Sequence, residues 1–325
     1  MSVCIDGGPH VICAQQFSRN WLEEVLFPLA DKEGEHFRNG DGSRPLIGKE
    51  MVSLFVGESL RTRARFEIAM RRLGGNVIFG TEAAKKFSSM AKGESLEDTI
   101  TVLNEYGADV IVLRHDEEGG AAQAASVSSI PIINAGDGPG QHPTQALLDI
   151  YTIKRYFGKI DGLEFAAVGD LPGSRTIHSL AYLLGKYKDI KIHFISPDDR
   201  RIGTNITEYL QRHNVSYTEG NDVRDVASKV DVFYQTRTQI NLGSKAWDRH
   251  DRTQGCTIID KEVLGLAKSS AIILHPLPCL DEIVRKEVDG DSRAVYIKTN
   301  GDRVSQVRCG LFITSALLKI IILGA

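Results

Sequence analysis

The chain contains 325 residues, of which 42% are hydrophobic and 25% are charged, so it has enough material for two globular domains. Its formal net charge of −3 excludes the strongly basic surface expected of a protein whose main partner is nucleic acid or an acidic membrane. The five cysteines form no C-x-x-C pair and no zinc-binding cluster with histidine, which is typical of a reduced cytoplasm.

The first half of the chain alternates short β-branched runs with longer stretches of helical periodicity. This pattern predicts parallel strands joined by helices. Ser95 is followed three residues later by Asp98, which resembles a capping box and predicts a helix from there to about Tyr106. The expected strands are Met51–Val56, Asn76–Phe79, Asp109–Leu113 and Ile130–Ile133.

The second half repeats the pattern after a helix that contains Leu147–Phe157 and a turn at Gly158–Gly162. This helix and turn mark the expected domain boundary. The expected strands are Glu164–Val168, Lys191–Ile195, Asp231–Gln235 and Ala271–Leu274, and the expected helices are Thr176–Tyr187 and Thr204–His213.

The sequence therefore predicts an α/β protein of two lobes, each a mostly parallel sheet flanked by helices, with the active site in the cleft between them. The lobes are expected at residues 1–150 and 151–303, with a C-terminal helix of about 304–325 packing back on the first. The apolar run Gly310–Ala325 is short for a membrane span and contains Lys319, which favours this docked helix. Residues 1–15 lack the pattern of a targeting peptide, which favours a cytoplasmic location.

A cluster of hydroxyl and guanidinium groups follows the first expected strand. Ser59-Leu60-Arg61-Thr62-Arg63 opens a helix with an apolar face. Free backbone N–H groups and the positive end of the helix dipole attract phosphate, and arginine binds phosphate oxygens bidentately. The motif therefore predicts a phosphate site, although the same residue types also form solvated helix caps.

Two further polar clusters follow strands of the first lobe. Arg114 and His115 come directly after the strand ending at Leu113. The glycine-rich turn that follows the next strand brings His142 and Gln145 to its carboxyl end. Because α/β sheets bind ligands at the carboxyl ends of their strands, these side chains are candidates for the same site.

Three clusters occupy equivalent positions in the second lobe: Gly169–Thr176, Tyr234–Gln239 and His275–Pro278. The first lacks both G-x-G-x-x-G and G-x-x-x-x-G-K-[ST], which argues against dehydrogenases and nucleotide hydrolases. All six clusters contain arginine or histidine, and independent surface loops do not explain this recurrence.

The sequence resembles the aspartate/ornithine carbamoyltransferase family from about Met51 to the C-terminus. Ser-Leu-Arg-Thr-Arg is similar to the family's carbamoyl phosphate signature, Ser-Thr-Arg-Thr-Arg. Gly-Gln-His-Pro-Thr-Gln, Gly-Asp-Leu, Thr-Arg-Thr-Gln and His-Pro-Leu-Pro follow in the order of the aspartate branch, and the ornithine motifs Asp-Ser-Met-Gly and His-Cys-Leu-Pro are missing. The resemblance implies transfer of the carbamoyl group of carbamoyl phosphate to the amine of L-aspartate, in pyrimidine biosynthesis and without a cofactor or metal.

The resemblance also implies roles for individual side chains. Arg61, Thr62, Arg114 and His142 are expected to be catalytic, the last three by stabilising negative charge on the carbamoyl oxygen. The departing phosphate accepts the proton of the amine, so no side-chain base is expected. Carbamoyl phosphate is expected to contact Ser59, Arg61, Thr62, Arg63, Arg114, His142, Gln145 and Leu277.

The acceptor amino acid carries two carboxylates, and the family's positions for binding them are filled by Arg175, Arg237 and Gln239. Ser88 and Lys92 match residues that the family donates from a neighbouring subunit, which implies a homotrimer with shared active sites. The sequence contains no zinc site for regulatory subunits and does not identify any.

A few residues depart from the family pattern. Leu60 replaces the usual threonine, Glu58 replaces proline, and Ile240–Gly243 replaces Lys-Glu-Arg. Cys279 stands where arginine is usual, and without an activating partner it is expected to be a packing residue. Three alternatives therefore stay open: another acceptor such as a diamino acid, a catalytically silent homologue, and a binding protein for phosphorylated ligands.

Overall fold

The computed structural model describes residues 8–40, 42–78, 84–237, 257–299 and 303–324. The chain divides into two compact units: unit 1 comprises Met1–Tyr151 and Arg308–Ala325, and unit 2 comprises Thr152–Val307. The chain passes from unit 1 to unit 2 within α7 (Pro143–Phe157) and returns to unit 1 within α12 (Gln306–Leu323). Unit 2 is therefore an insertion between two segments of unit 1.

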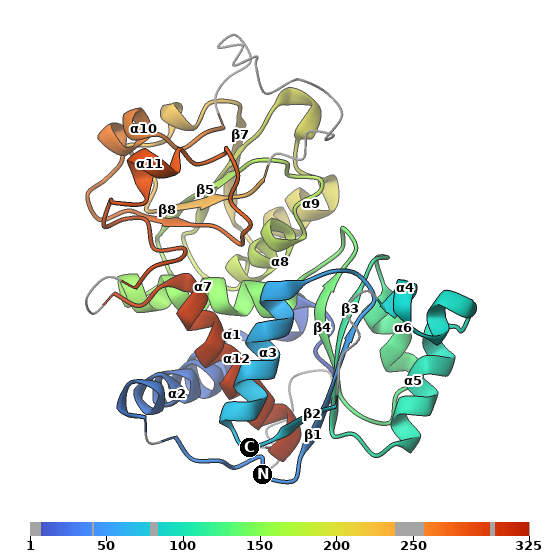
Figure 1. Ribbon diagram of the computed structural model, residues 1–325. Helices are drawn as coiled ribbons and strands as arrows, with labels where there is room; N and C mark the ends of the chain where they lie inside the picture. Colours follow the sequence, from blue (N-terminus) through green and yellow to red (C-terminus); the bar gives the residue numbers. More distant parts are fainter. Residues whose placement is uncertain (1–7, 41, 79–83, 238–256, 300–302, 325) are drawn as a thin grey trace. The chain divides into compact units, whose positions relative to one another are not determined.

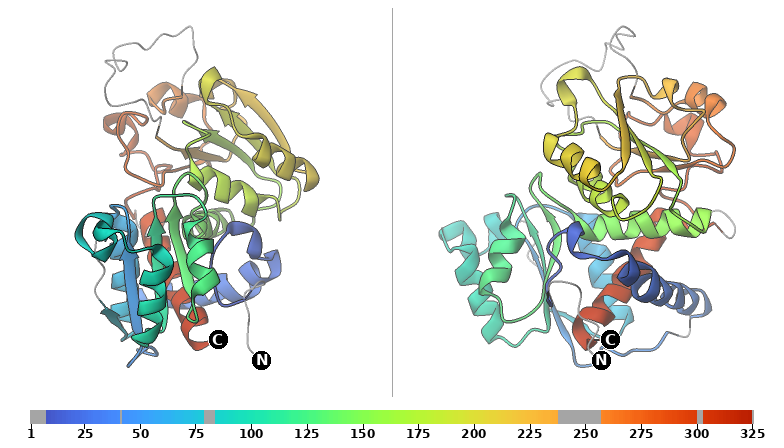
Figure 2. Two further views of the ribbon diagram at one scale, coloured as in Figure 1. Left: turned by 90° about the vertical axis from the view of Figure 1, so that its right-hand side faces the viewer. Right: turned by 180° about the vertical axis from the view of Figure 1, so that it is seen from behind.

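Unit 1 contains a four-stranded parallel sheet. Its strands are β1 (Glu50–Phe55), β2 (Asn76–Ile78), β3 (Val110–His115) and β4 (Ile132–Asp137), in the order β2-β1-β3-β4. Its helices are η1 (Ala14–Gln16), α1 (Arg19–Trp21), η2 (Leu22–Leu26), α2 (Phe27–Asn39), α3 (Leu60–Arg72), α4 (Ala84–Phe87), η3 (Ser89–Lys92), α5 (Leu96–Glu105), α6 (Gly120–Val127) and α12 (Gln306–Leu323). Helices α4, α5 and α6 cover one face of the sheet, and α3 and α12 cover the other (Figures 1 and 2).

Unit 2 contains a five-stranded parallel sheet. Its strands are β5 (Glu164–Val168), β6 (Lys191–Ile195), β7 (Ser216–Gly220), β8 (Val232–Gln235) and β9 (Ile272–Leu274), in the order β7-β6-β5-β8-β9. Its helices are α8 (Arg175–Leu184), η4 (Asp198–Arg200), α9 (Thr204–Arg212), η5 (Val223–Asp225), α10 (Lys261–Leu266) and α11 (Arg285–Val288). Figure 2 shows α8 and α9 on one face of this sheet and α10 and α11 on the other.

The structure confirms the two parallel sheets flanked by helices, because each predicted strand coincides with a strand of the fold to within two residues at its start. Strands such as β1 and β4 are buried along nearly their whole length, since helices cover both faces. The predicted helix cap is present as well: the Ser95 hydroxyl accepts a hydrogen bond from the backbone N–H of Asp98, at 3.0 Å. β7 was not predicted, because it is a polar edge strand whose residues are partly exposed.

Helix α12 is long and apolar enough to cross a membrane by length and composition, and among the described residues it is the one helix with this property. In the structure 61% of it is buried. Its Lys319 Nζ lies 2.8 Å from Glu33 Oε1 of α2, and its Phe312 packs against Gly34. These contacts make it a core helix of unit 1.

Each sheet changes its direction of winding at one point. In unit 1 the strand order places β2 and β3 on opposite sides of β1, and in unit 2 it places β6 and β8 on opposite sides of β5. The loops that leave the two strands at such a point diverge and leave space for a ligand at the carboxyl edge of the sheet. Four of the six polar clusters predicted from the sequence lie at the ends of β1, β3, β5 and β8, the strands at these two points.

Candidate active site

In unit 1 the carboxyl ends of β1, β3 and β4 lie next to one another. Phe55 of β1 is in register with Arg114 of β3, and His115 of β3 with Asp137 of β4. The loop after β1, the end of β3 and the loop after β4 therefore meet at one edge of the sheet. All the candidate phosphate and carbamoyl ligands except Leu277 lie on these segments.

The loop after β1 leads directly into α3. Ser59 is the N-cap residue of this helix, and its hydroxyl does not cap the helix. Arg61 is exposed, Thr62 is buried, and the first turn contains no acidic residue. Two arginines in the first turn of a helix oppose the helix dipole, so this end of α3 is prepared for an anion.

Arg63 differs from Arg61 in its surroundings. Its Nε lies 2.7 Å from Glu67 Oε1, one turn along the same helix. This i,i+4 ion pair occupies one edge of the guanidinium. The rest of the Arg63 guanidinium faces away from this ion pair.

Arg114 is attached to the neighbouring strand through its side chain. Its Nη1 donates to the backbone oxygen of Ala135 on β4, at 3.4 Å. Its own carbonyl oxygen accepts from Val56 N–H at 2.9 Å, which joins it to the loop after β1. The guanidinium thus belongs to the same sheet edge as the α3 N-terminus.

The loop between β4 and α7 is organised by a buried carboxylate, Asp137. Its Oδ1 accepts from the backbone N–H of Gln141 at 2.9 Å, and its Oδ2 accepts from Gly119 N–H at 3.1 Å. A Cβ on Gly138 would lie 2.8 Å from the carbonyl oxygen of Asp116, so this close approach of two loops requires glycine. Sequence inspection missed Asp137, although an Asp flanked by glycines is a recognisable turn signal.

Asp137 and its loop place His142 at the start of α7, where its carbonyl oxygen accepts from the N–H groups of Gln145 and Ala146. Pro143 follows as the first helical residue, a position that does not require its missing N–H. His142 is 4% exposed and Gln145 is 8% exposed, so both side chains are held in one place.

Ser88 and Lys92 lie on the surface of unit 1, between α4 and α5. The Ser88 hydroxyl accepts from Met90 N–H and donates to the carbonyl oxygen of Ala84. The Lys92 side chain is exposed and has no hydrogen bond or ion pair with any described residue.

In unit 2 the loops after β5 and β8 meet at the sheet edge. Asp170 N–H donates to the carbonyl oxygen of Arg237 at 3.3 Å, and the Thr236 hydroxyl donates to the carbonyl oxygen of Val168 at 3.0 Å. Gly169 lies at the crossing of the two loops with φ +130°, and a Cβ there would lie 2.5 Å from Thr236 Oγ1. Only glycine fits this position.

The two arginines of unit 2 are carried by these loops. Arg175 is the first residue of α8, whose first turn contains no acidic residue. The Nε of Arg237 is buried and has no hydrogen-bond partner among the described residues. Gln239, the third residue predicted to bind the acceptor, lies outside the described residues.

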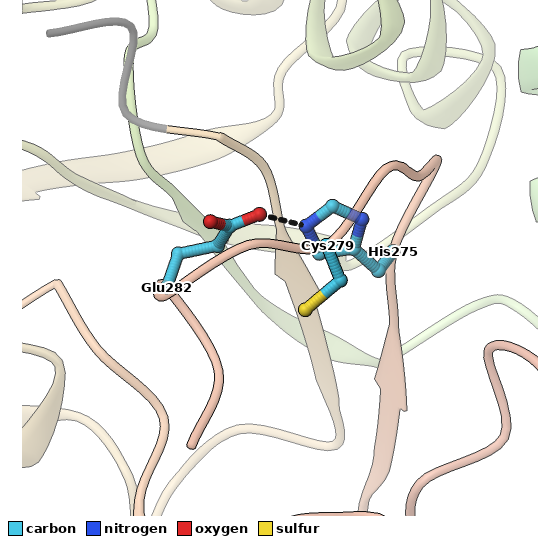
Figure 3. A group of neighbouring side chains, drawn as sticks. All are labelled: His275, Cys279 and Glu282. Atoms are coloured by element: carbon cyan, nitrogen blue, oxygen red, sulfur yellow. Dashed lines mark hydrogen bonds and ion pairs between the residues drawn. The ribbon is translucent and has the colours of Figure 1, made fainter. Parts of the chain in front are cut away.

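Leu277 follows β9, the strand next to β8, and belongs to unit 2. Its φ is +62°, a left-handed conformation that is unfavourable for leucine. Its backbone N–H donates to His275 Nδ1 at 2.8 Å, and His275 Nε2 lies 2.8 Å from Glu282 Oε1 (Figure 3). Burial opposes ionisation of Glu282, but the hydrogen bonds from His275 and the backbone outweigh it and lower the pKa of this carboxyl.

His275, Cys279 and Glu282 also form a group whose ligand atoms lie within 4.8 Å of one another, close enough to suggest a metal site. The hydrogen bonds favour a different interpretation. Because Nδ1 accepts from Leu277 N–H, the imidazole proton lies on Nε2 and is donated to Glu282. A metal on Nε2 would have to displace that proton, so we interpret the chain Glu282–His275–Leu277 as the support of the Leu277 backbone.

Burial, followed by the negative charge of Glu282, raises the pKa of the Cys279 thiol to about 11. At neutral pH this cysteine is therefore a neutral thiol. This agrees with the packing role expected from the sequence, because a nucleophilic cysteine needs a lowered pKa.

The chain matches two family models over most of its length. Residues 9–155 match the aspartate/ornithine carbamoyltransferase carbamoyl-P binding domain, and residues 161–320 match the Asp/Orn binding domain of the same family.

Aspartate carbamoyltransferases from several organisms are similar to this chain over nearly its whole length. An aspartate carbamoyltransferase from Oryza sativa, named chloroplastic, is 49% identical over 97% of this chain and 85% of its own length. The catalytic subunit from Methanopyrus kandleri is 41% identical over 97% of both chains. The structure of the Trypanosoma cruzi aspartate transcarbamoylase with carbamoyl phosphate and aspartate superposes with a TM-score of 0.86, at 35% identity over 98% of both chains.

Proposed function

Because the chain belongs to the aspartate/ornithine carbamoyltransferase family, we propose that unit 1 binds carbamoyl phosphate and unit 2 binds the acceptor amino acid. The protein transfers the carbamoyl group of carbamoyl phosphate to the amine of L-aspartate and releases N-carbamoyl-L-aspartate and phosphate. Relatives at 41% to 49% identity are named aspartate carbamoyltransferases. Family members with this activity serve pyrimidine biosynthesis.

One observation carries the assignment of unit 1. The N-terminus of α3, with Arg61 and no acidic residue in its first turn, meets the ends of β3 and β4 at the winding change of the sheet. Backbone N–H groups, the helix dipole and the guanidinium of Arg61 all favour a doubly charged phosphate there. Ser59 and Arg63 complete this set in the proposal, Arg63 with the part of its guanidinium that Glu67 does not occupy.

The carbonyl oxygen of the carbamoyl group is the atom on which negative charge develops during transfer. Attack by the amine gives a tetrahedral intermediate with negative charge on this oxygen, and we assign Thr62, Arg114 and His142 as its hydrogen-bond donors. We also assign Gln145 to the carbamoyl amide and the Leu277 backbone to the binding of carbamoyl phosphate. Binding the two substrates in attack geometry supplies the remaining rate enhancement, so no covalent enzyme intermediate is needed.

The acceptor is bound by Arg175 and Arg237, with Gln239, in this proposal. Both arginines lie on loops at the winding change of the second sheet, and Arg237 has a buried Nε without a described partner. A buried donor without a partner costs free energy unless a ligand satisfies it. A substrate carboxylate would satisfy it.

The acceptor is tested with a panel of amino acids and carbamoyl phosphate. L-Aspartate is expected to be carbamoylated, whereas L-ornithine and 2,4-diaminobutyrate are not. Loss of one charged partner costs about 2–5 kcal/mol, so Arg237→Ala is expected to raise KM for aspartate by about 100-fold. Arg212→Ala, which removes an exposed arginine of α9, is the control. Turnover of a diamino acid in place of aspartate would contradict the assignment.

The working unit in this proposal is a homotrimer. Lys92 is exposed and without a described partner, as expected of a residue that acts in a neighbouring subunit, and Ser88 lies beside it. We also propose a cytoplasmic location, supported by the free thiols of Cys13, Cys279 and Cys309, although the plant relatives are named chloroplastic.

Shared sites are tested by subunit mixing. Lys92→Ala and Arg61→Ala are each expected to be nearly inactive, but mixed trimers assembled from both should regain activity, because one site then combines an intact Arg61 with an intact Lys92. Mixing Arg61→Ala with His142→Ala, which damage the same half of the site, is the control and should restore nothing. If native mass spectrometry shows mixed trimers that remain inactive, Lys92 does not act across subunits.

A further inference from the structure

We propose that Arg65 and Asp149, two residues outside the assigned site, fix the hydrogen-bonding polarity of the carbamoyl pocket. Arg65 acts through Thr144 and makes His142 present a donor, while Asp149 makes Gln145 present an acceptor. This inference rests on the proposed function, since it concerns the two side chains assigned there to the carbamoyl group. All five residues belong to unit 1.

The first step is the contact between Arg65 and Thr144. Arg65 lies on the second turn of α3, and its Nη2 is 3.3 Å from Thr144 Oγ1 at the start of α7. A guanidinium can only donate hydrogen bonds. The Thr144 hydroxyl therefore accepts from Arg65.

The second step sets the tautomer of His142. Thr144 Oγ1 is 3.3 Å from His142 Nδ1, and Thr144 is 1% exposed. If the hydroxyl accepted from both neighbours, its own proton would be buried without an acceptor among the described residues, at a cost of about 1–3 kcal/mol. Donation to Nδ1 avoids this cost. The imidazole proton then lies on Nε2, which makes that nitrogen a donor.

The third step sets the orientation of the Gln145 amide. Its Nε2 donates to Asp149 Oδ1 at 2.9 Å, and Asp149 is fully buried. An ionised carboxylate can only accept, so it selects the amide nitrogen and turns Gln145 Oε1 the other way. Gln145 therefore offers an acceptor for a ligand.

Arg65 remains a cation although it is buried. Burial lowers the pKa of Arg65 to about 10, and the attraction of Asp149 opposes this decrease. Arg65 therefore stays positively charged at neutral pH. Gly310 of α12 leaves room for the Arg65 side chain, because a Cβ on Gly310 would lie 3.2 Å from Arg65 Cδ. The Arg65 Nε is buried and has no hydrogen-bond partner among the described residues.

The resulting polarity matches a carbamoyl group. Its carbonyl oxygen accepts a hydrogen bond and fits His142 Nε2–H, while its amide N–H donates and fits Gln145 Oε1. Acetyl phosphate, which has a methyl group in place of the amide nitrogen, would leave Gln145 Oε1 without a partner. Arg65, Thr144 and Asp149 are thus positioning residues for specificity towards carbamoyl phosphate.

The test uses the full chain labelled with ¹⁵N-histidine, with the His142 signals identified by their loss in His142→Asn. In the wild type, His142 is expected to carry its proton on Nε2. Thr144→Val removes the hydroxyl at nearly constant volume and should give a tautomer mixture, with kcat reduced roughly tenfold or more and KM for carbamoyl phosphate little changed. Thr144→Ser retains the hydroxyl and should restore both the tautomer and most of kcat.

Three outcomes are informative. A wild-type His142 with its proton on Nδ1, or identical behaviour of Thr144→Val and Thr144→Ser, would overturn the proposal. The first of these measurements needs no variant, so misfolding cannot obscure it. If the wild type carbamoylates no amino acid, the proposed function fails separately, because the NMR signals still report the tautomer.

Discussion

Replacing Arg61 with alanine is expected to lower kcat/KM for carbamoyl phosphate by about 100- to 1000-fold while the protein remains folded. Arg61 is exposed, so its removal should cost little stability. The variant loses the interactions of the guanidinium with the phosphate and with the charge that develops during transfer. Steady-state kinetics measure the loss of activity, and thermal unfolding shows whether the stability has changed.

The matched control for Arg61 is Arg71→Ala. Arg71 is exposed near the other end of α3, and its replacement changes the net charge and helix propensity in the same way. It is expected to retain nearly full activity. Equal losses in both variants would mean that overall charge, and not the N-terminus of α3, governs carbamoyl phosphate binding.

Replacing Gly169 with alanine is expected to reduce the free energy of unfolding by about 3 kcal/mol and to weaken aspartate binding. The added Cβ would lie 2.5 Å from Thr236 Oγ1 and 2.6 Å from its carbonyl oxygen, and φ +130° is unfavourable for alanine. Relief of this clash must move the segment that carries Arg237. Denaturant unfolding and KM for aspartate measure the two consequences.

Gly265→Ala is the control for Gly169. Gly265 lies in α10, its added Cβ would meet no atom within 4 Å, and its φ is not in the left-handed range. Alanine should therefore be neutral or slightly stabilising there. A Gly169→Ala variant as stable as Gly265→Ala would show that the loops after β5 and β8 separate easily.

The fold could be read from the sequence wherever burial is two-sided. Strands such as β1 and β5 are covered on both faces, so their apolar runs stand out from their surroundings. β7 is an edge strand with the sequence Ser-Tyr-Thr-Glu-Gly, and its pairing with β6 depends on a neighbour that local composition does not reveal. The C-terminal helix was visible because its apolar run is long.

The candidate site was readable only in part, for a related reason. Arg114 lies at the end of β3, and Arg61 and Arg237 lie shortly after β1 and β8, so the ends of parallel strands predict their place. Their supports are different, because Asp149 and Glu282 matter only through contacts with Gln145 and His275, which no motif reports. The pairing of Arg63 with Glu67 was within reach, since a spacing of four residues on a helix predicts it.

The return of the chain to unit 1 has a consequence for biosynthesis. Helix α12 supplies Cys309, Phe312, Leu317 and Ile320 to the core of unit 1, yet it leaves the ribosome after unit 2. The domain that begins first is thus completed last, and the whole inserted unit can form before it closes. Until α12 docks, the apolar surface that it covers is exposed to solvent. A chain truncated before α12 would therefore be bound by chaperones or degraded by proteases.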